Sequence, residues 1–190
     1  FIIGKVIGTE TSRVLGDSVD GQGLQELSAT LSKKLNTIIN KNAKDLMPKI
    51  KERKDIIAAL KTKLGTAAKP VVYIKIPEQH ISQPSVDPAA QTEMQLICKE
   101  LGFTVTENPD DADIKITGEG FSEFATRKGD IISVKARLEV KATDKEGNII
   151  AVDRQTAVAA GTAEQVTAKS ALQEASAQLT DRLIPKIVKK

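Results

Sequence analysis

The chain is poor in aromatic residues and in cysteine and histidine. Its 190 residues include no Trp, one Tyr, four Phe, one Cys and one His. A lone Cys excludes an intrachain disulfide, and one Cys with one His cannot supply the ligand set of a structural zinc site. No uninterrupted apolar run reaches the length of a membrane-spanning helix. Because aromatic residues are scarce, the core must be built from Ile, Val, Leu and Ala. A chain of this length buries roughly 70% of the surface that its unfolded form exposes, so it requires no crosslinks.

Neither sign of charge dominates the composition, but one region is basic. The net charge is only +3, whereas residues 33–69 hold eleven Lys or Arg against three acidic residues. Such a region can contact a polyanion such as nucleic acid or anionic lipid, and a solvated helix face is the competing interpretation. Because only one of these eleven cations, Arg53, is Arg and no aromatic residue interleaves, we expect no specific nucleic-acid binding. The candidate contacts with an anionic surface are Lys51, Lys54, Lys61 and Lys63.

The clearest structural pattern lies in residues 132–142, where apolar and polar residues alternate without a miss. Alternation of this kind predicts a strand with one face on a core and the other in water. A polar turn over 144–148 and a returning arm over 149–159 predict a hairpin. We expect the inward residues of its first arm to pack against the last helix, over 162–184.

The rest of the chain predicts further strands and helices. We expect strands over 2–14, 71–76, 103–107, 112–117 and 119–126, and helices over 24–39, 49–64 and 88–101. These elements predict the α+β class, with a mixed sheet, a long C-terminal antiparallel hairpin and helices on one face. We expect residues 1–69 to form a strand–helix–helix region packed on the core, and residues 70–190 to form the α+β core.

Several residues mark the expected ends of these elements. Gly118 and Gly120 separate the two strands within 112–126. Asp87 is expected to cap the helix that begins at 88. Thr162 and Gln165 fit a capping box for the last helix, and Pro185 is expected to end or kink it.

Two helical segments resemble each other. Residues 24–39 and 172–187 agree at eight of sixteen positions, and each is expected to follow a strand. Leu, Gln, Glu, Ser and Ala are common helix formers, so shared composition explains the agreement as well as a duplication does. Both explanations remain open from the sequence.

His80 is the only histidine, and it follows the carboxyl end of the strand over 71–76, where ligands of open α/β sheets often bind. Paired with Glu78 it could form the acid and base of a hydrolase, whereas a solvated loop histidine is the simpler interpretation. No Ser or Cys in a recognisable nucleophile motif accompanies it in the sequence. We therefore predict no catalytic residues, metal site or cofactor, and we expect Cys98 to be a buried, inert thiol.

The loop expected over 77–85 is the candidate partner surface. It is bracketed by two prolines and combines polar side chains with an apolar tip. Residues 118–124 are expected to lie beside it and to add aromatic anchors. The predicted partner-binding residues are Glu78, Gln79, His80, Ile81, Phe121 and Phe124.

The order of elements over 70–190 resembles a cell-envelope family that includes the curli secretion-channel protein (CsgG). Activator lipoproteins of penicillin-binding proteins and the flagellar H-ring assembly protein are its relatives, and all share a domain like the amino-terminal domain of TolB. The segments that carry the likeness are 71–77, 101–105, 112–119, 134–140 and 171–175.

This resemblance implies a non-enzymatic bacterial envelope protein of assembly or scaffold type. Its partners would be other envelope proteins or further copies of itself. It would be exported to the periplasm or associated with the outer membrane. The chain begins at Phe1, which we interpret as a processed or truncated sequence. Any membrane tether would then belong to a removed N-terminal segment.

Overall fold

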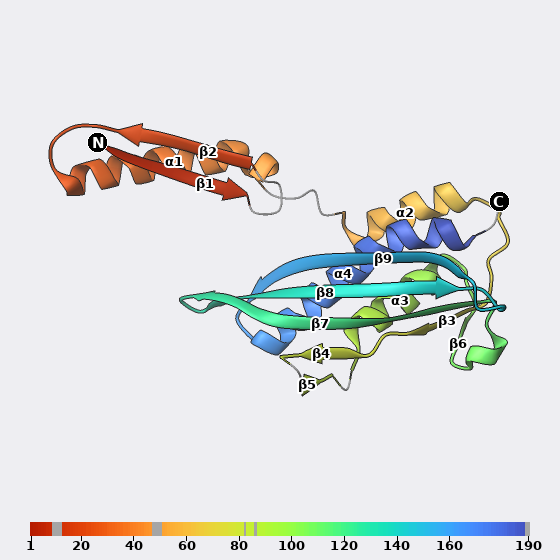
Figure 1. Cartoon of the computed structure of the whole chain (residues 1–190). Coiled ribbons are helices and arrows are strands. Elements are labelled where there is room, and N and C mark those ends of the chain that lie inside the picture. Colours follow the sequence, from red (N-terminus) through yellow and green to blue (C-terminus); the bar gives the residue numbers. More distant parts are fainter. Residues whose placement is uncertain (9–12, 47–50, 82, 86, 189–190) are drawn as a thin grey trace. The chain divides into compact units, whose positions relative to one another are not determined.

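The computed structural model describes residues 1–8, 13–46, 51–81, 83–85 and 87–188. The chain divides into two compact units, which we call the hairpin unit (Phe1–Ile50) and the sheet unit (Lys51–Lys190) (Figure 1). We expected the division after residue 69, but it falls before helix α2 (Arg53–Leu64). The reason is that the apolar face of α2 belongs to the core of the sheet unit.

The hairpin unit begins with two antiparallel strands, β1 (Ile2–Gly8) and β2 (Arg13–Val19). The expectation of a single strand over 2–14 was wrong, because this region contains two strands and Gly16 lies within the second. A Cβ atom at Gly16 would lie 2.8 Å from the carbonyl oxygen of Gly4. The missing side chain therefore lets the two strands approach each other closely.

Helix α1 (Leu24–Leu46) packs on this hairpin. The helix predicted over 24–39 is confirmed and continues further, although the backbone of Asn42 departs from helical geometry (φ −116°, ψ 17°). A Cβ atom at Gly4 would lie 2.6 Å from Leu35 Cδ1 and 3.2 Å from Leu31 Cδ2. These leucines are thus seated directly on the glycine of β1.

The sheet unit contains a seven-stranded mixed sheet. Strands β3, β4, β6 and β7 pair in parallel, and β4–β5, β7–β8 and β8–β9 pair antiparallel. The long strand β7 pairs with β3 and β4 on one side and with β8 on the other, and β9 lies beyond β8. Its strands and remaining helices are β3 (Val72–Lys75), β4 (Glu78–His80), β5 (Gln83–Pro84), α3 (Ala89–Glu100), β6 (Val105–Thr106), the 3-10 turn Pro109–Asp111, β7 (Ile114–Lys128), β8 (Ile131–Thr143), β9 (Ile149–Gly161) and α4 (Glu164–Ile187).

Helices α3 and α4 lie together on one face of this sheet and leave the other face of β7, β8 and β9 open (Figure 1). The core between the layers is aliphatic, as the composition predicted, and Ile74, Met94 and Leu183 are at most 1% exposed. Val134, Leu138 and Val140 of β8 are also buried. The predicted α+β class, the C-terminal hairpin and its packing on the last helix are confirmed.

Glycines do not break β7, contrary to the expectation of two strands. Gly118 and Gly120 both lie within the continuous strand. A Cβ atom at Gly118 would collide with the carbonyl oxygen of Glu139 on β8, and one at Gly120 would lie 3.1 Å from Leu172 of α4. The glycines therefore allow close packing within the sheet and against the helix, and they do not interrupt the strand.

The ends of α4 differ from the prediction. The N-cap residue is Ala163 and no side chain caps the helix, so the Thr162–Gln165 capping box was wrong. Pro185 lies inside the helix, which continues to Ile187. Proline removes one amide donor, and in the last turn of a helix this interrupts few hydrogen bonds.

Candidate functional site

The segment 77–85 is a small hairpin and not a loop. Strand β4 pairs in parallel with β7, with Gln79 opposite Phe121 and His80 opposite Ser122. The prediction that this segment lies beside residues 118–124 is therefore confirmed. Ile81, at the turn between β4 and β5, is 54% exposed and has a left-handed backbone with φ of 46°.

The six predicted partner-binding residues do not form one surface, because neighbouring residues of a strand face opposite sides of the sheet. Gln79 and Phe121 lie opposite each other on the open face. Phe124 lies three residues further along β7, opposite the fully buried Val134, and so belongs to the helix-covered side. The structure thus separates the two phenylalanines proposed as joint anchors.

Glu78 is a structural residue of the helix layer. It is 3% exposed, and its carboxylate accepts hydrogen bonds from the backbone amides of Ala89 (2.7 Å), Ala90 (2.7 Å) and Gln91 (3.1 Å). Burial raises the pKa of Glu78, while these three hydrogen bonds and Lys169 act in the opposite direction. Its oxygens are therefore engaged at the start of α3, where an acidic group is favourable, and are not presented to a partner or to His80.

Asp87 does not cap α3, so that prediction was wrong. The N-cap residue is Pro88, without a side-chain cap, and the buried carboxylate of Glu78 reaches the helix from β4. Asp87 instead lies 3.4 Å from the Nζ atom of Lys169 on α4. A cap supplied from eleven residues earlier in the chain has no local sequence signal.

His80 lies between two polar side chains from distant segments. Its Nδ1 is 2.9 Å from Ser122 Oγ on β7, and its Nε2 is 3.4 Å from Glu164 Oε1 at the start of α4. Sequence reasoning missed both partners, because they stand 42 and 84 residues further along the chain. The His80 side chain is 19% exposed, whereas Ser122 is 1% exposed.

A hollow of about 770 Å³ opens over His80. It is bounded by the β4–β5 hairpin on one side and by the first turns of α4 on the other. Polar groups converge on its floor, and Ile81 lies at its rim. The lining includes Gln79, His80, Ile81, Ser122, Glu164 and Lys169. Its size and its mixture of polar and apolar groups suit a side chain or short segment of a partner.

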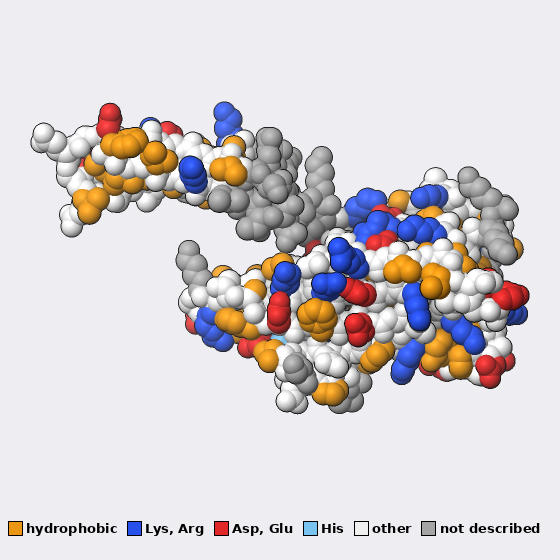
Figure 2. Space-filling model, in the orientation of Figure 1, with side chains coloured by type: hydrophobic (Ala, Val, Ile, Leu, Met, Phe, Trp, Pro, Cys, Tyr) orange, Lys and Arg blue, Asp and Glu red, His pale blue; other side chains and the backbone are white. Residues whose placement is uncertain are grey.

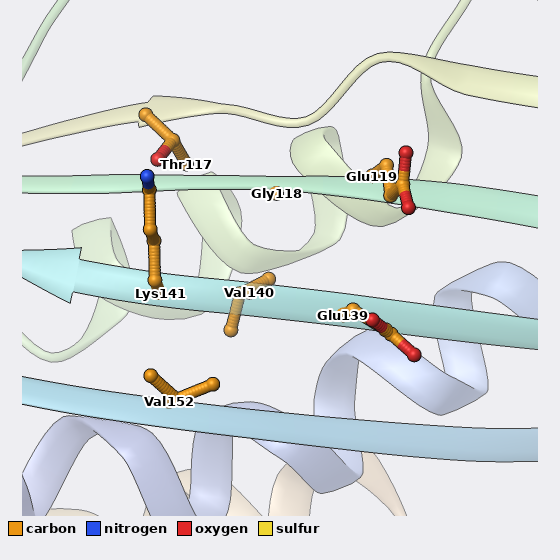
Figure 3. Close-up of a pocket in the computed structure, with 7 residues that line it drawn as sticks. All are labelled: Thr117, Gly118, Glu119, Glu139, Val140, Lys141 and Val152. Atoms are coloured by element: carbon orange, nitrogen blue, oxygen red, sulfur yellow. The ribbon is translucent and has the colours of Figure 1, made fainter.

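The open face of the sheet carries a second, shallower hollow of about 470 Å³ across β7, β8 and β9. Figure 3 shows Thr117 and Lys141 on neighbouring strands, with Val152 beyond them on β9. Glu119 and Glu139 lie directly opposite each other. In the space-filling view, hydrophobic side chains on this side are interspersed with charges of both signs (Figure 2). None of the predicted partner-binding residues lines this hollow.

Two of the four lysines proposed for an anionic surface already have acidic partners. The Nζ atom of Lys51 is 2.6 Å from Asp181, and that of Lys54 is 2.8 Å from Glu52. Lys61 and Lys63 are exposed on α2, one on each flank of its buried face. This arrangement favours a solvated helix face, and polyanion binding stays a prediction.

Other features of the described residues add no chemical group to the site. Cys98 is fully buried, as predicted, and burial raises the pKa of its thiol to about 12. The described His, Cys, Asp and Glu side chains include no cluster that could hold a metal ion. In the same part of the chain, no helix has both the length and the apolarity to cross a membrane.

No family model and no curated protein matches the sequence, but solved structures resemble the chain at low identity. A minor lipoprotein from Acinetobacter baumannii is 15% identical, covering 63% of this chain and 92% of its own, with a TM-score of 0.43. Lipoprotein GNA1162 from Neisseria meningitidis is 11% identical, covering 50% and 87%, with a TM-score of 0.33. The LpoB C-terminal domain from Salmonella enterica is 10% identical, covering 53% and 91%, with a TM-score of 0.30. Bacterial lipoproteins thus recur among these structures, and similarity at this level assigns neither an activity nor a partner to this chain.

Proposed function

We propose that the chain is a non-enzymatic bacterial envelope protein of assembly or scaffold type. It binds a partner protein at the hollow beside the β4–β5 hairpin. The envelope assignment rests on the sequence resemblance over residues 70–190, and it implies export to the periplasm or association with the outer membrane. The partner is another envelope protein or a further copy of the chain.

Ile81 is the observation that supports the partner surface best. A β-branched residue with positive φ is rare, and such backbone strain costs about 1–3 kcal/mol. Here it holds an apolar side chain, 54% exposed, at the rim of a hollow of about 770 Å³. Strained, exposed apolar residues beside a concave surface are suited to anchor a partner.

The test compares Ile81→Ser with Ile149→Ser, which removes another exposed Ile far from the hollow. Ile149 is 62% exposed at the start of β9. Each variant is immobilised and used to capture proteins from a bacterial envelope extract, and its thermal stability is measured alongside. We expect Ile81→Ser to lose a protein that the wild type and Ile149→Ser both retain, with melting temperatures that agree. Equal capture by both variants would contradict the proposed surface.

A hydrolase is the second candidate, because the structure brings a Ser to the histidine. Ser122, His80 and Glu164 form a chain of the kind that activates a serine nucleophile. However, Ser122 is 1% exposed, and a nucleophile must be reachable by its substrate. Ester hydrolysis that is abolished by both Ser122→Ala and His80→Ala would favour this candidate over a scaffold. Activity that survives both substitutions would exclude these residues from catalysis.

A further inference from the structure

Two segments of the chain share both an arrangement and a sequence motif. Each is a β-hairpin followed by one long helix, namely β1–β2–α1 and β8–β9–α4. The motif Leu-x-Pro-Lys-Ile occurs at residues 46–50 and again at 183–187, where it closes α4. The match between 24–39 and 172–187 instead pairs Leu35 and Ile39 with Leu183 and Ile187, so the two matches are alternative registers about three helical turns apart. The shared order of a hairpin and a helix is therefore the basis on which we compare the two segments.

The two copies differ in how their strands are completed. In the sheet unit, β8 has β9 on one side and β7 on the other, paired from Ile131 to Thr143. In the described part of the hairpin unit, β1 and β2 pair only with each other. The first copy therefore lacks the strand that corresponds to β7, at the outer edge of β1.

The hairpin unit also has little core of its own. Among its described residues only Val19 and Leu31 are buried, whereas Ile3 and Val14 are 56% and 57% exposed on the face away from α1. An isolated two-stranded hairpin is marginally stable in water, and in this unit the packing of α1 is what supports it. An additional strand beside β1 would extend the surface on which α1 packs.

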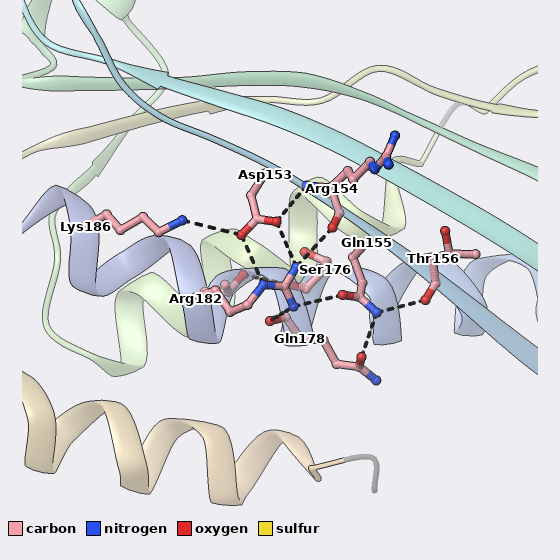
Figure 4. A network of polar contacts seen from close by, with 9 residues as sticks. Asp153, Arg154, Gln155, Thr156, Ser176, Gln178, Arg182 and Lys186 are labelled. Atoms are coloured by element: carbon pink, nitrogen blue, oxygen red, sulfur yellow. Dashed lines mark hydrogen bonds and ion pairs between the residues drawn. The ribbon is translucent and has the colours of Figure 1, made fainter. Parts of the chain in front are cut away.

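Strand β9 is the counterpart of β2, and its outer edge indicates why we expect an additional strand at β1 and not at β2. Arg182 of α4 donates to the carbonyl oxygen of Arg154 (3.0 Å), to Asp153 Oδ1 (2.9 Å) and to Gln155 Oε1 (2.8 Å) (Figure 4). Gln155 in turn donates to the carbonyl oxygen of Thr156 (2.9 Å). Side chains thus occupy backbone acceptors along β9, which hinders the addition of a strand there. In the sheet unit the additional strand is β7, and it pairs with β8, which is the counterpart of β1.

We propose that β1 is a self-association edge, at which β1 of one molecule pairs antiparallel with β1 of a second molecule of the same chain. A two-fold axis between identical strands generates an antiparallel pair directly. The product is a four-stranded sheet in the order β2–β1–β1–β2, with both α1 helices on one face. This interface uses residues other than those of the proposed partner surface at Ile81, so either proposal can fail while the other holds.

The side chains of β1 favour a register centred on Gly4. In this register Ile2 lies opposite Val6 of the other molecule, on the face that α1 covers. Ile3 lies opposite Lys5, and the two Lys5 ammonium groups are not opposed, which avoids a repulsive cross-strand pair. A shift by one residue would turn the apolar side chains of one strand to the wrong face.

Site-directed crosslinking of the full chain tests both the interface and its register. Ile3→Cys and Lys5→Cys are prepared separately, mixed and mildly oxidised. We expect a disulfide-linked dimer in the mixture at least tenfold more abundant than with Ile3→Cys alone. The mixture of Ile3→Cys with Val14→Cys is the matched control, because Val14 is equally exposed but lies on β2. The native Cys98 is fully buried and does not interfere.

Sedimentation velocity of the unmodified chain provides the second measurement. We expect the dimer fraction to rise between about 1 and 100 µM. A chain that stays monomeric throughout this range would overturn the proposal. So would a dimer that crosslinks equally through Val14→Cys, because its interface would then lie elsewhere.

Discussion

The hairpin β8–β9 with α4 and the hairpin β1–β2 with α1 have the same order of elements but very different burial. Every inward residue of β8 from Ile132 to Ala142 is at most 3% exposed. In the described part of the first hairpin, only Val19 is buried. The difference shows that an alternating strand and an amphipathic helix define a hairpin–helix unit, whereas its burial depends on the neighbouring strands.

The largest effect on stability should come from a substitution in the buried face of the hairpin β8–β9. Leu138→Asp places a charge at a position that is 0% exposed, between the sheet and α4, with no partner to stabilise it. We expect the free energy of unfolding of the sheet unit to fall by about 4 kcal/mol or more. Thermal or urea unfolding monitored by circular dichroism measures the change.

Arg137→Ala is the matched control for this substitution, because it alters the neighbouring residue on the open face. Arg137 is 42% exposed at its side chain, where it pairs with Glu139. We expect a change within about 0.5 kcal/mol. Equal destabilisation by the two substitutions would show that the face assignment of β8 is wrong.

A smaller and more local effect is expected in the first copy. Leu31→Ala removes one of the two residues that are buried in its described part, and core truncations of this kind cost about 2–3 kcal/mol. Because the two units are separate compact regions, amide exchange should accelerate in β1, β2 and α1 and remain unchanged in β7 and β8. Uniform acceleration across both units would contradict their independence. Ser32→Ala, at the exposed neighbouring position, is the control.

Sequence patterns predicted the strands and helices well where periodicity was strong, as in β8, β9 and α1. They failed where tertiary contacts decide the outcome. Gly118 was interpreted as a strand break, although it accommodates the backbone of β8. Asp87 was the local choice for a cap, yet Glu78 supplies it from another strand.

The candidate site was predictable only in part. Residues 78–81 were located correctly beside β7, because strand order follows from chain topology. Which side chains meet there was not predictable. Ser122 and Glu164 reach His80 only after β7 and α4 have packed, and opposite faces of β7 separate Phe121 from Phe124. Contacts between distant segments leave no periodic signal in the sequence.

The smallest effect concerns the closed edge of β9, where the hydrogen bond from Arg182 lowers the pKa of Asp153 below its ordinary value of 3.8. The folded chain therefore binds fewer protons at this carboxylate than the unfolded chain does near pH 3 to 4. The stabilisation is present above the ordinary pKa and is lost as the pH falls through the lowered one. Because Arg182 is 42% exposed at its side chain, we expect Asp153→Asn to cost at most about 1 kcal/mol at neutral pH.

Urea unfolding at pH 6 and pH 3 should show a smaller acid-induced loss of unfolding free energy for Asp153→Asn than for the wild type. Asp110→Asn, at a carboxylate that is 88% exposed, should leave that loss unchanged. Identical losses in all three proteins would mean that the pair of Arg182 with Asp153 does not stabilise this edge, and the closure of β9 would then rest on the hydrogen bonds to the carbonyl oxygens of Arg154 and Thr156.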